Sequence, residues 1–205
     1  MQLDPATMAT PSVYKLLIGC VVPRPIAWVS TVGRDGVHNL APFSFFMGVC
    51  GDPPTIAFSS GPREGRAKDT VANLEHTGDF VVNIVDDARA EQMNVTSGEY
   101  APDVDEFALT GLTALPGVKV RAPRVAEAPI SLECRLDRAL SVGRGPHTLV
   151  LGQIVCFHVR DDLYEPATGR IDMHRLQPVG RLAGHLYSHI HDIFEMKRPN
   201  ERYAG

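Results

Sequence analysis

The sequence predicts a mainly β protein, a closed or partly closed antiparallel β-barrel with a few helices, formed by a single domain over residues 1–205. Short runs rich in β-branched and aromatic residues recur along the chain, and turns containing glycine or proline separate them. Helical periodicity is confined to short stretches. The last long run is apolar on both faces, which is typical of a strand covered on both sides. About six or seven strands with few helices favour a barrel.

The first strands form an ordered series. Ile26–Val32 is expected to be a strand, Gly33–Gly36 a hairpin turn, and a second strand begins at Val37. After a break at Gly51–Pro54, Thr55–Ser59 is expected to form a third strand. Three strands in sequence predict a meander.

The rest of the barrel is expected from two kinds of pattern. Apolar residues at helical spacing predict a short helix over Arg66–His76, and Phe80–Val85 predicts a strand. Ser131–Val142 and His147–Val159 predict two longer strands, the second covered by the barrel core and by a helix or a second subunit. The segment Ala88–Pro129 either forms a lid over a site or wraps the barrel.

Composition limits the function classes. Lys and Arg number 20 and Asp and Glu number 24, a net charge of −4, so no bulk positive field attracts nucleic acid or an anionic membrane. No stretch of about 18 or more uncharged apolar residues occurs. The first residues show no basic region followed by an apolar run. We expect a cytoplasmic protein with neither nucleic-acid nor membrane partners.

The two ends and the cysteines complete this outline. Residues 1–22 are expected to be an N-terminal lead-in, and residues 178–205 a C-terminal extension that packs on the domain or serves as a dimer arm. The four cysteines lie far apart, without the spacing of a metal site, which favours buried free thiols: Cys20, Cys50, Cys134 and Cys156.

Several common catalytic motifs do not occur. The sequence has no G-x-G-x-x-G after a strand, no G-x-x-x-x-G-K-[ST], no G-x-S-x-G and no H-E-x-x-H. An unassisted nucleophile or a zinc hydrolase is therefore poorly supported. If the protein is an enzyme, a bound cofactor carries the reaction.

The stretch from Phe58 to Thr70 has the features of a phosphate site. Two hydroxyls end a strand, a loop with three cationic side chains comes next, and a helix begins near Asp69 or Thr70. Hydroxyls, cations and the free N–H groups of a helix start suit a phosphate monoester. The alternative is a helix N-cap at Asp69 or Thr70 beside solvated basic residues.

The stretch Asn39–Phe46 is a strand that contains Pro42, which cannot donate a ladder hydrogen bond. Part of its backbone must face something other than a neighbouring strand. A flat heteroaromatic ligand could use those free groups together with the Ser44 hydroxyl. The alternative is an edge strand with a bulge.

Taken together, these segments resemble a known family. P-R-P-I-A-W-V-S-T-V-G-x-D-G, N-L-A-P-F-S-F-F, D-P-P-T-I-A-F-S-S, K-D-T-x-x-N and F-V-V-N-I-V are similar to the flavin reductase-like family of FMN-binding split barrels, which includes the flavoredoxins. The resemblance is dense over Pro23–Val85 and looser over Ser131–Pro199. It implies a Greek-key-like split β-barrel that forms a homodimer and binds FMN near the subunit interface.

The resemblance also implies site residues. The flavin ring and ribityl chain would be lined by Ser30, Thr31, Asn39, Leu40, Ala41, Pro42, Phe43 and Ser44. The phosphate would be held by Ser59, Ser60, Arg66, Lys68 and Thr70. Asp69 is then expected to cap the helix. Trp28 and Phe43 could stack on flavin but are more typical of core residues.

The implied activity is the reduction of flavin by NAD(P)H, with the electrons passed to an acceptor or to a partner monooxygenase. His147 matches a histidine that many shorter flavin reductases have on the nicotinamide side, although Pro146 replaces the preceding aspartate of their Gly-Asp-His run. A flavoredoxin-like electron carrier without nicotinamide turnover and a non-catalytic FMN-binding module are the alternatives.

Histidines are frequent near the C-terminus. On a helix, His185 and His189 would share a face in a geometry that could hold a metal ion, but no carboxylate or cysteine completes a set at helical spacing. We therefore expect no metal site. A polar wall beside the flavin, formed by His185 or Tyr187, or ordinary packing, would account for these residues.

Overall fold

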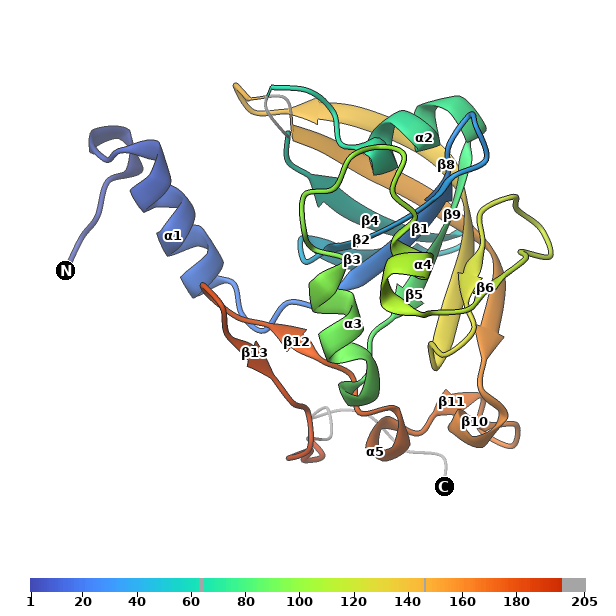
Figure 1. Ribbon diagram of the computed structural model, residues 1–205. Coiled ribbons are helices and arrows are strands. Elements are labelled where there is room, and N and C mark those ends of the chain that lie inside the picture. Colours follow the sequence, from blue (N-terminus) through green and yellow to red (C-terminus); the bar gives the residue numbers. More distant parts are fainter. Residues whose placement is uncertain (63–64, 146, 197–205) are drawn as a thin grey trace.

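The computed structural model describes residues 1–62, 65–145 and 147–196, and its centre is a seven-stranded antiparallel sheet. The strands are β1 (Ala27–Val32), β2 (His38–Phe43), β3 (Phe46–Gly51), β4 (Pro54–Ser60), β5 (Asp79–Ile84), β8 (Ile130–Val142) and β9 (His147–Val159). Their order in the sheet is β2-β1-β5-β8-β9-β4-β3 (Figure 1). The prediction of a mainly β architecture is confirmed.

The sheet curves so that its two edges approach each other. β2 and β3 occupy opposite ends of the strand order, yet only Ser44 and Phe45 separate them in the chain. Across this junction the Ser59 backbone N–H donates to the Phe45 carbonyl at 2.8 Å. A sheet whose edges are joined by two residues is a partly closed barrel, the predicted architecture.

The predicted meander is wrong. β1 pairs with β2 and β3 pairs with β4, but β4 lies between β3 and β9 instead of beside β2. Pro42 sits near the end of β2, where it can donate no ladder hydrogen bond, and the chain then turns at Ser44. The hairpin of β3 and β4 therefore forms at the edge of the sheet opposite to that of β1 and β2.

The remaining element predictions agree closely with the structure. β9 has the predicted bounds, β8 begins one residue earlier, and β5 spans Asp79–Ile84. The predicted helix over Arg66–His76 is α2 (Asp69–Thr77). The lead-in contains a helix that the sequence did not predict, α1 (Thr10–Cys20), preceded by a 3-10 turn at Pro5–Thr7.

The inside of the barrel holds one apolar cluster. Its largest fully buried members include Phe58, Phe80, Val29 and Val82, and Phe43 packs at 5.0 Å, centroid to centroid, from Phe58. Gly152 in β9 allows the Phe80 ring to approach, because a Cβ there would collide with the ring. Trp28 and Phe43 are thus buried core residues, as their type favours.

The segment between β5 and β8 wraps the outside of the barrel. It contains α3 (Ala90–Val95), α4 (Glu106–Thr110), the short strands β6 (Ala114–Leu115) and β7 (Arg124–Val125), and a 3-10 turn at Asp87–Arg89. A second apolar cluster lies beneath it, in which Met93, Phe107 and Val125 pack with Trp28 and Leu40. Of the two alternatives expected for this segment, the structure therefore shows that it wraps the barrel.

The outer face of β9 is less covered than expected. Val150 and Ile154 point into the core, whereas Leu149 and Leu151, on the opposite face, are half-buried. Within the described residues of one chain, this part of the outer face is therefore only partly covered. Covering by a second subunit remains a prediction.

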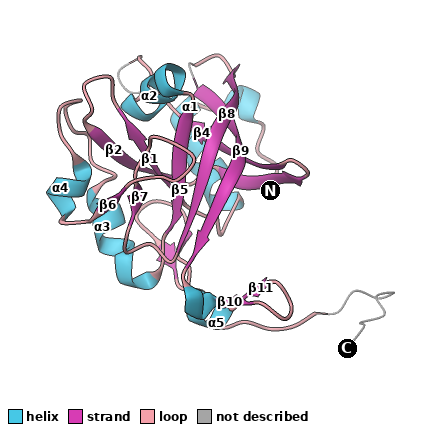
Figure 2. Ribbon diagram, turned by 90° about the vertical axis from the view of Figure 1, so that its right-hand side faces the viewer, coloured by secondary structure: helices cyan, strands magenta, loops and turns pink. Residues whose placement is uncertain are grey.

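The chain ends extend from the barrel. α1 has no buried residue and stands away from the barrel in Figure 1. After β9 come a 3-10 turn (Asp161–Leu163), β10 (Tyr164–Glu165), β11 (Arg170–Ile171) and α5 (Met173–Leu176), which lie at one end of the barrel in Figure 2. The hairpin of β12 (Gly180–Arg181) and β13 (Tyr187–Ser188) comes next. Among the described residues, no helix is both long and apolar enough to cross a bilayer.

The C-terminal hairpin packs on the domain, as one of the two expectations had it. Arg24 and Arg181 exchange backbone hydrogen bonds of 3.0 and 2.8 Å, and the Val179 N–H donates to the Val85 carbonyl at 3.0 Å. The Arg24 guanidinium, itself buried, donates to the carbonyls of Ile18 and Leu182. Arg24 therefore ties α1 and the hairpin to the barrel.

The cysteine prediction holds only in part. All four thiols are free, but Cys20 and Cys50 are exposed, Cys156 is half-buried, and only Cys134 is fully buried. Cys20 lies at the end of the protruding helix α1, and Cys50 lies on the edge strand β3. Other described parts of the structure therefore leave both thiols uncovered. Burial raises the pKa of the Cys134 thiol, which keeps it protonated and inert.

Candidate functional site

Two adjoining hollows form a groove along the outside of β2. The larger has a volume of about 750 Å³ and the smaller about 80 Å³, and both are lined by Pro42 and Ser97. From the predicted site, Asn39, Ala41, Lys68 and Thr70 line the smaller hollow and Ser44 lines the larger. Predicted residues from two separate stretches of sequence therefore meet on one groove.

One wall of the groove belongs to the barrel. Pro42 lies opposite Trp28 in the β1–β2 ladder, and Ser44 comes directly after the end of β2. The Arg24 side chain donates to the Ser44 hydroxyl at 3.4 Å through Nε. The buried strand β1 and the buried Arg24 guanidinium therefore fix the position of this wall.

The other wall comes from α3 and the C-terminal hairpin. Tyr187 and His185 line the larger hollow together with Asn94, and the Tyr187 hydroxyl donates to the Asn94 side-chain oxygen at 3.2 Å. The Arg181 guanidinium lies 4.4 Å from the centroid of the Tyr187 ring. The two residues expected to form a polar wall therefore line the same hollow as Ser44, and their place beside a flavin stays a prediction.

The smaller hollow has mixed charge. Lys68 lines it, with its Nζ 5.8 Å from the centroid of the Phe43 ring. The carboxylates of Asp69, Glu99 and Glu106 line the same hollow. Glu106 accepts a hydrogen bond of 3.0 Å from the Leu40 N–H, and burial raises the pKa of its carboxyl. Among the described residues, this hollow is therefore lined by one cation, Lys68, and three acids.

The start of α2 differs from the expectation. The N-cap position is Lys68, whose side chain caps nothing, and Asp69 and Thr70 are already helical. The expectation that Asp69 or Thr70 is the N-cap is therefore wrong. The helix begins one residue earlier, because Lys68 has the extended backbone conformation of a cap, with φ −69° and ψ 157°. No capping side chain of the N-cap residue occupies the first N–H groups of this helix.

Hydrogen-bonded side chains support the groove from behind. Asn39 donates to Thr70 at 2.9 Å and to Thr31 at 3.3 Å, and Asn73 donates to Thr31 at 3.0 Å. This network ties β1 and β2 to the first two turns of α2. The hydroxyl of Ser30, one residue before Thr31, donates to the Pro123 carbonyl.

Buried residues that line neither hollow include four of those predicted to line a ligand: Ser30, Thr31, Leu40 and Phe43. Asn39 and Thr70 are also buried, although they line the smaller hollow. Three others lie at the end of β4 and in the loop between β4 and α2. Ser59 is half-buried, the Ser60 hydroxyl donates to the Gly61 carbonyl at 3.3 Å, and Arg66 is exposed. Arg63 of the same basic loop lies outside the described residues.

His147 is exposed at the first position of β9. Its Nε2 would lie 3.3 Å from a Cβ built on Gly61, so the ring is beside the loop after β4. It does not line either hollow of the groove. The preceding Pro146, where the sequence departs from Gly-Asp-His, lies outside the described residues.

Two carboxylate–histidine groups were not predicted from the sequence. In the first, Glu133 is fully buried and accepts from the Val118 and Lys119 N–H groups at 2.7 and 2.6 Å, with His158 Nε2 at 2.6 Å. Burial would raise the pKa of Glu133, but these three contacts outweigh it and lower the pKa. The alternation of Glu133 with apolar neighbours in β8 gave no sign of such partners.

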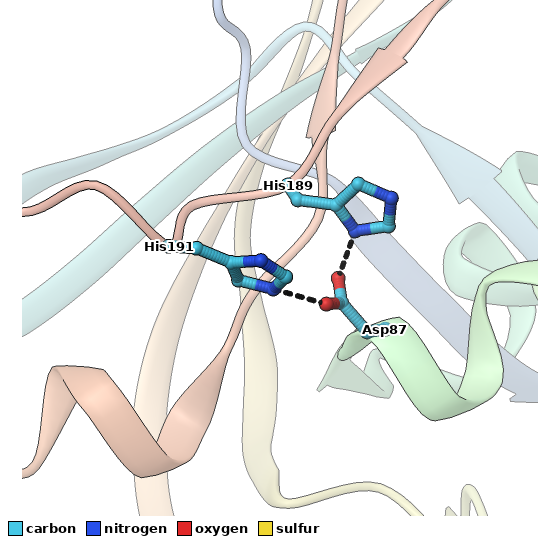
Figure 3. A group of neighbouring side chains, drawn as sticks. All are labelled: Asp87, His189 and His191. Atoms are coloured by element: carbon cyan, nitrogen blue, oxygen red, sulfur yellow. Dashed lines mark hydrogen bonds and ion pairs between the residues drawn. The ribbon is translucent and has the colours of Figure 1, made fainter.

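The second group joins Asp87 to His189 and His191. His189 Nδ1 lies 2.8 Å from Asp87 Oδ1, and His191 Nε2 lies 2.6 Å from Asp87 Oδ2 (Figure 3). The helical arrangement considered for His185 and His189 is not present, because β13 and a segment without regular secondary structure occupy this region. In an extended chain, residues two apart share a face, and the His-x-His spacing was the available signal.

Comparison with known proteins identifies relatives of this chain. The model of the flavin reductase like domain matches residues 18–176. The structure is similar to nitrilotriacetate monooxygenase component B from Bacillus cereus, with 38% identity, a TM-score of 0.92, and coverage of 96% of this chain and 98% of that chain.

Two further structures are similar. The 2-nitrobenzoate 2-nitroreductase of Pseudomonas fluorescens is 30% identical, with a TM-score of 0.90 and full coverage of both chains. Flavoredoxin of Desulfovibrio vulgaris is 24% identical, with a TM-score of 0.76 and 98% coverage of each chain, a likeness of fold.

Proposed function

The chain belongs to the flavin reductase-like family, and on that premise we propose that it is an FMN-dependent oxidoreductase. In this proposal NAD(P)H reduces the flavin, and the electrons pass to an acceptor such as a partner monooxygenase. The similarity to a protein named as a monooxygenase component supports this choice of partner. A cytoplasmic location is part of the same proposal.

The observation that carries the proposal is the pair of joined hollows. FMN has a flat ring system, a flexible polyol chain and a terminal phosphate, so it needs a broad cavity connected to a small anion site. The hollow of about 750 Å³ lies within the usual size range of ligand pockets, and the smaller hollow contains Lys68 at the N-terminus of α2. The larger hollow therefore fits the ring system, and Lys68 with the helix N-terminus fits the phosphate, against the opposing charge of Asp69, Glu99 and Glu106.

Each part of the groove has a role in the proposal. Lys68, the Thr70 hydroxyl and the first N–H groups of α2 hold the phosphate, with Ser59, Ser60 and Arg66 as further contacts. Asn39, Ala41, Pro42 and Ser44 line the ring and the polyol chain. Ser30, Thr31, Leu40 and Phe43 support that wall from behind.

Bound FMN would supply the redox chemistry, accepting a hydride equivalent from reduced nicotinamide and releasing electrons to the acceptor. The chain's own residues bind and orient, so no dedicated general acid or base is required. Arg24 fixes Ser44 at the floor of the larger hollow. Tyr187 and His185 form the opposite polar wall of that hollow.

His147 remains the proposed contact on the nicotinamide side. We expect His147→Ala to slow nicotinamide oxidation while FMN affinity stays at the wild-type value, because the residue does not line the groove. Steady-state turnover and an FMN titration measure the two quantities. Wild-type turnover in the variant would remove His147 from the proposal.

The proposal includes a homodimer. Exposed apolar side chains are grouped on α1, where Tyr14 is 54% and Leu17 48% exposed, and on the edge strand β3, where Met47 is 57% and Val49 45% exposed. A second copy of the chain would cover such surfaces. Sedimentation equilibrium of the purified protein measures the oligomeric state.

The test is an anaerobic absorption spectrum of the FMN-loaded protein, recorded before and after addition of NADH and then NADPH. Rapid bleaching of the flavin band by either nucleotide is the expected result. A flavin band that both nucleotides leave unchanged would favour the electron-carrier alternative. A protein that binds no FMN would contradict the proposal altogether.

A further inference from the structure

We propose that Asp87, His189 and His191 form a binding site for a divalent transition-metal ion. The two histidines come from the segment after β13, and Asp87 comes from the 3-10 turn shortly after β5, about a hundred residues earlier in the chain. Figure 3 shows both imidazoles directed at the same carboxylate. This inference is independent of the proposed flavin chemistry.

The geometry places three ligand atoms together. His189 Nδ1, His191 Nε2 and a carboxylate oxygen of Asp87 all lie within 4.8 Å of one another. Bonds of about 2.0 to 2.2 Å put two ligands of a tetrahedral zinc ion roughly 3.3 Å apart, so the present contacts would open by roughly 0.5 to 0.7 Å. The side chains are exposed, His189 by 69% and His191 by 56%, and can make this adjustment.

The three ligand atoms favour particular metal ions. Two imidazole nitrogens and one carboxylate oxygen suit zinc, iron, cobalt or nickel, whereas calcium and magnesium prefer oxygen ligands alone. Three protein ligands also leave coordination positions for water or another molecule. The ion would be partly exposed, since Asp87 retains 22% of its side-chain accessibility.

The other carboxylate–histidine group gives an internal contrast. Glu133, Cys156 and His158 also lie within ligand distance of one another, but both oxygens of Glu133 already accept backbone N–H groups. Within the described residues, the hydrogen bonds to the Asp87 side-chain oxygens come only from the two imidazoles. A metal ion could replace those bonds without leaving a buried N–H unpaired.

An ion bound at this position would affect the C-terminal wall of the groove. His189 also lines the larger hollow, so an ion here would link the turn after β5 to the C-terminal wall of the groove. The bound ion would replace two hydrogen bonds between exposed side chains with coordinate bonds. The segment after β13 should then become more resistant to proteolysis when the metal is present.

The experiment is calorimetric titration of the full chain, purified without a polyhistidine tag, with zinc chloride and in parallel with cobalt chloride. We expect one zinc ion per chain at this site, and a visible cobalt spectrum without a thiolate charge-transfer band. Asp87→Asn and His191→Gln should each weaken zinc binding at least about tenfold, since even an outer-shell partner contributes that much. His76→Gln, an exposed histidine on α2, is the matched control.

Three outcomes would overturn the proposal. One is zinc affinity that Asp87→Asn and His191→Gln leave at the value of His76→Gln. Another is a thiolate band in the cobalt complex, which would place the ion at a cysteine. The third is the lack of saturable zinc binding to the folded wild-type chain, which would leave the group as a hydrogen-bonded clasp between the imidazoles and the carboxylate.

Discussion

The two walls of the groove are built in different ways. The barrel wall is part of a continuous sheet, and the residues behind it are buried: Trp28, Leu40 and Phe43 are 0 to 5% exposed. The C-terminal wall rests on a two-residue β-ladder, on the backbone pairing of Arg181 with Arg24, and on side-chain contacts near the surface, such as that of Tyr187 with Asn94.

The two walls should therefore differ in how easily they deform. A wall supported by buried contacts keeps its shape at a high energetic cost of deformation, whereas a wall held by a few exposed contacts opens at low cost. A site that must bind a cofactor and admit further molecules needs both. Changes at fully buried positions of the barrel should therefore lower the free energy of unfolding most, and changes in the C-terminal wall should lower it least.

The largest expected effect is that of Glu133→Gln. The carboxylate of Glu133 accepts two backbone N–H groups and is fully buried, so an amide nitrogen in place of one oxygen would face a donor. We expect a loss of about 3 kcal/mol in the free energy of unfolding at neutral pH. Urea denaturation measures it.

The same variant has a predicted pH dependence. The folded pKa of Glu133 is lowered, so its ionisation contributes stability that is present above the ordinary value of 4.5 and is lost as the pH falls through the folded pKa. The difference between wild type and variant should therefore shrink at acidic pH. A difference that stays constant with pH would mean that packing, and not the carboxylate charge, holds the segment at Val118.

Glu106→Gln should have a smaller effect of opposite sign. Burial raises the folded pKa of Glu106, so its ionised form destabilises the protein once the pH exceeds that pKa, and no penalty exists below the ordinary value of 4.5. The glutamine carbonyl can still accept from the Leu40 N–H. We expect a gain of about 0.5 to 2 kcal/mol at neutral pH, comparable to other charge optimisations, which vanishes at acidic pH. A variant less stable than wild type at neutral pH would refute this.

Tyr187→Phe should have the smallest effect. The change removes one exposed hydrogen bond of 3.2 Å to Asn94 but keeps the ring under the Arg181 guanidinium. Global stability should fall by less than about 1 kcal/mol. Faster amide hydrogen exchange confined to the hairpin would be the sign of a locally weakened wall, and a large global loss would show that the two walls do not differ as described.

The sequence was informative where local patterns and packing agree. β9 and β8 alternate or are apolar over much of their thirteen residues each, and their bounds were predicted to within one residue. Pro42 and the basic loop before α2 identified most of the barrel wall of the groove. The prediction of a meander was wrong because the partner of β4 is β9, about ninety residues later, and no local pattern encodes that pairing.

The C-terminal wall was less accessible to prediction. Its residues are held by partners far away in the sequence, such as Asn94 for Tyr187 and Asp87 for His189, so spacing along the chain contained little of this information. The histidines were interpreted at helical spacing, although β13 and a segment without regular secondary structure occupy this region. Glu106 and Ser97, which line the groove, stand in a polar stretch without a recognisable motif.

The most direct test of the central claim is an FMN titration of Lys68→Ala, with Lys119→Ala as the control. Lys68 lines the small hollow, whereas Lys119 is not among its lining residues and donates its backbone N–H to Glu133. Loss of a charge-assisted phosphate contact should weaken FMN binding by about 1.5 to 3 kcal/mol, or about 10- to 150-fold, while Lys119→Ala binds as the wild type does. An unchanged dissociation constant in a folded Lys68→Ala protein would contradict the assignment of this groove to the flavin phosphate.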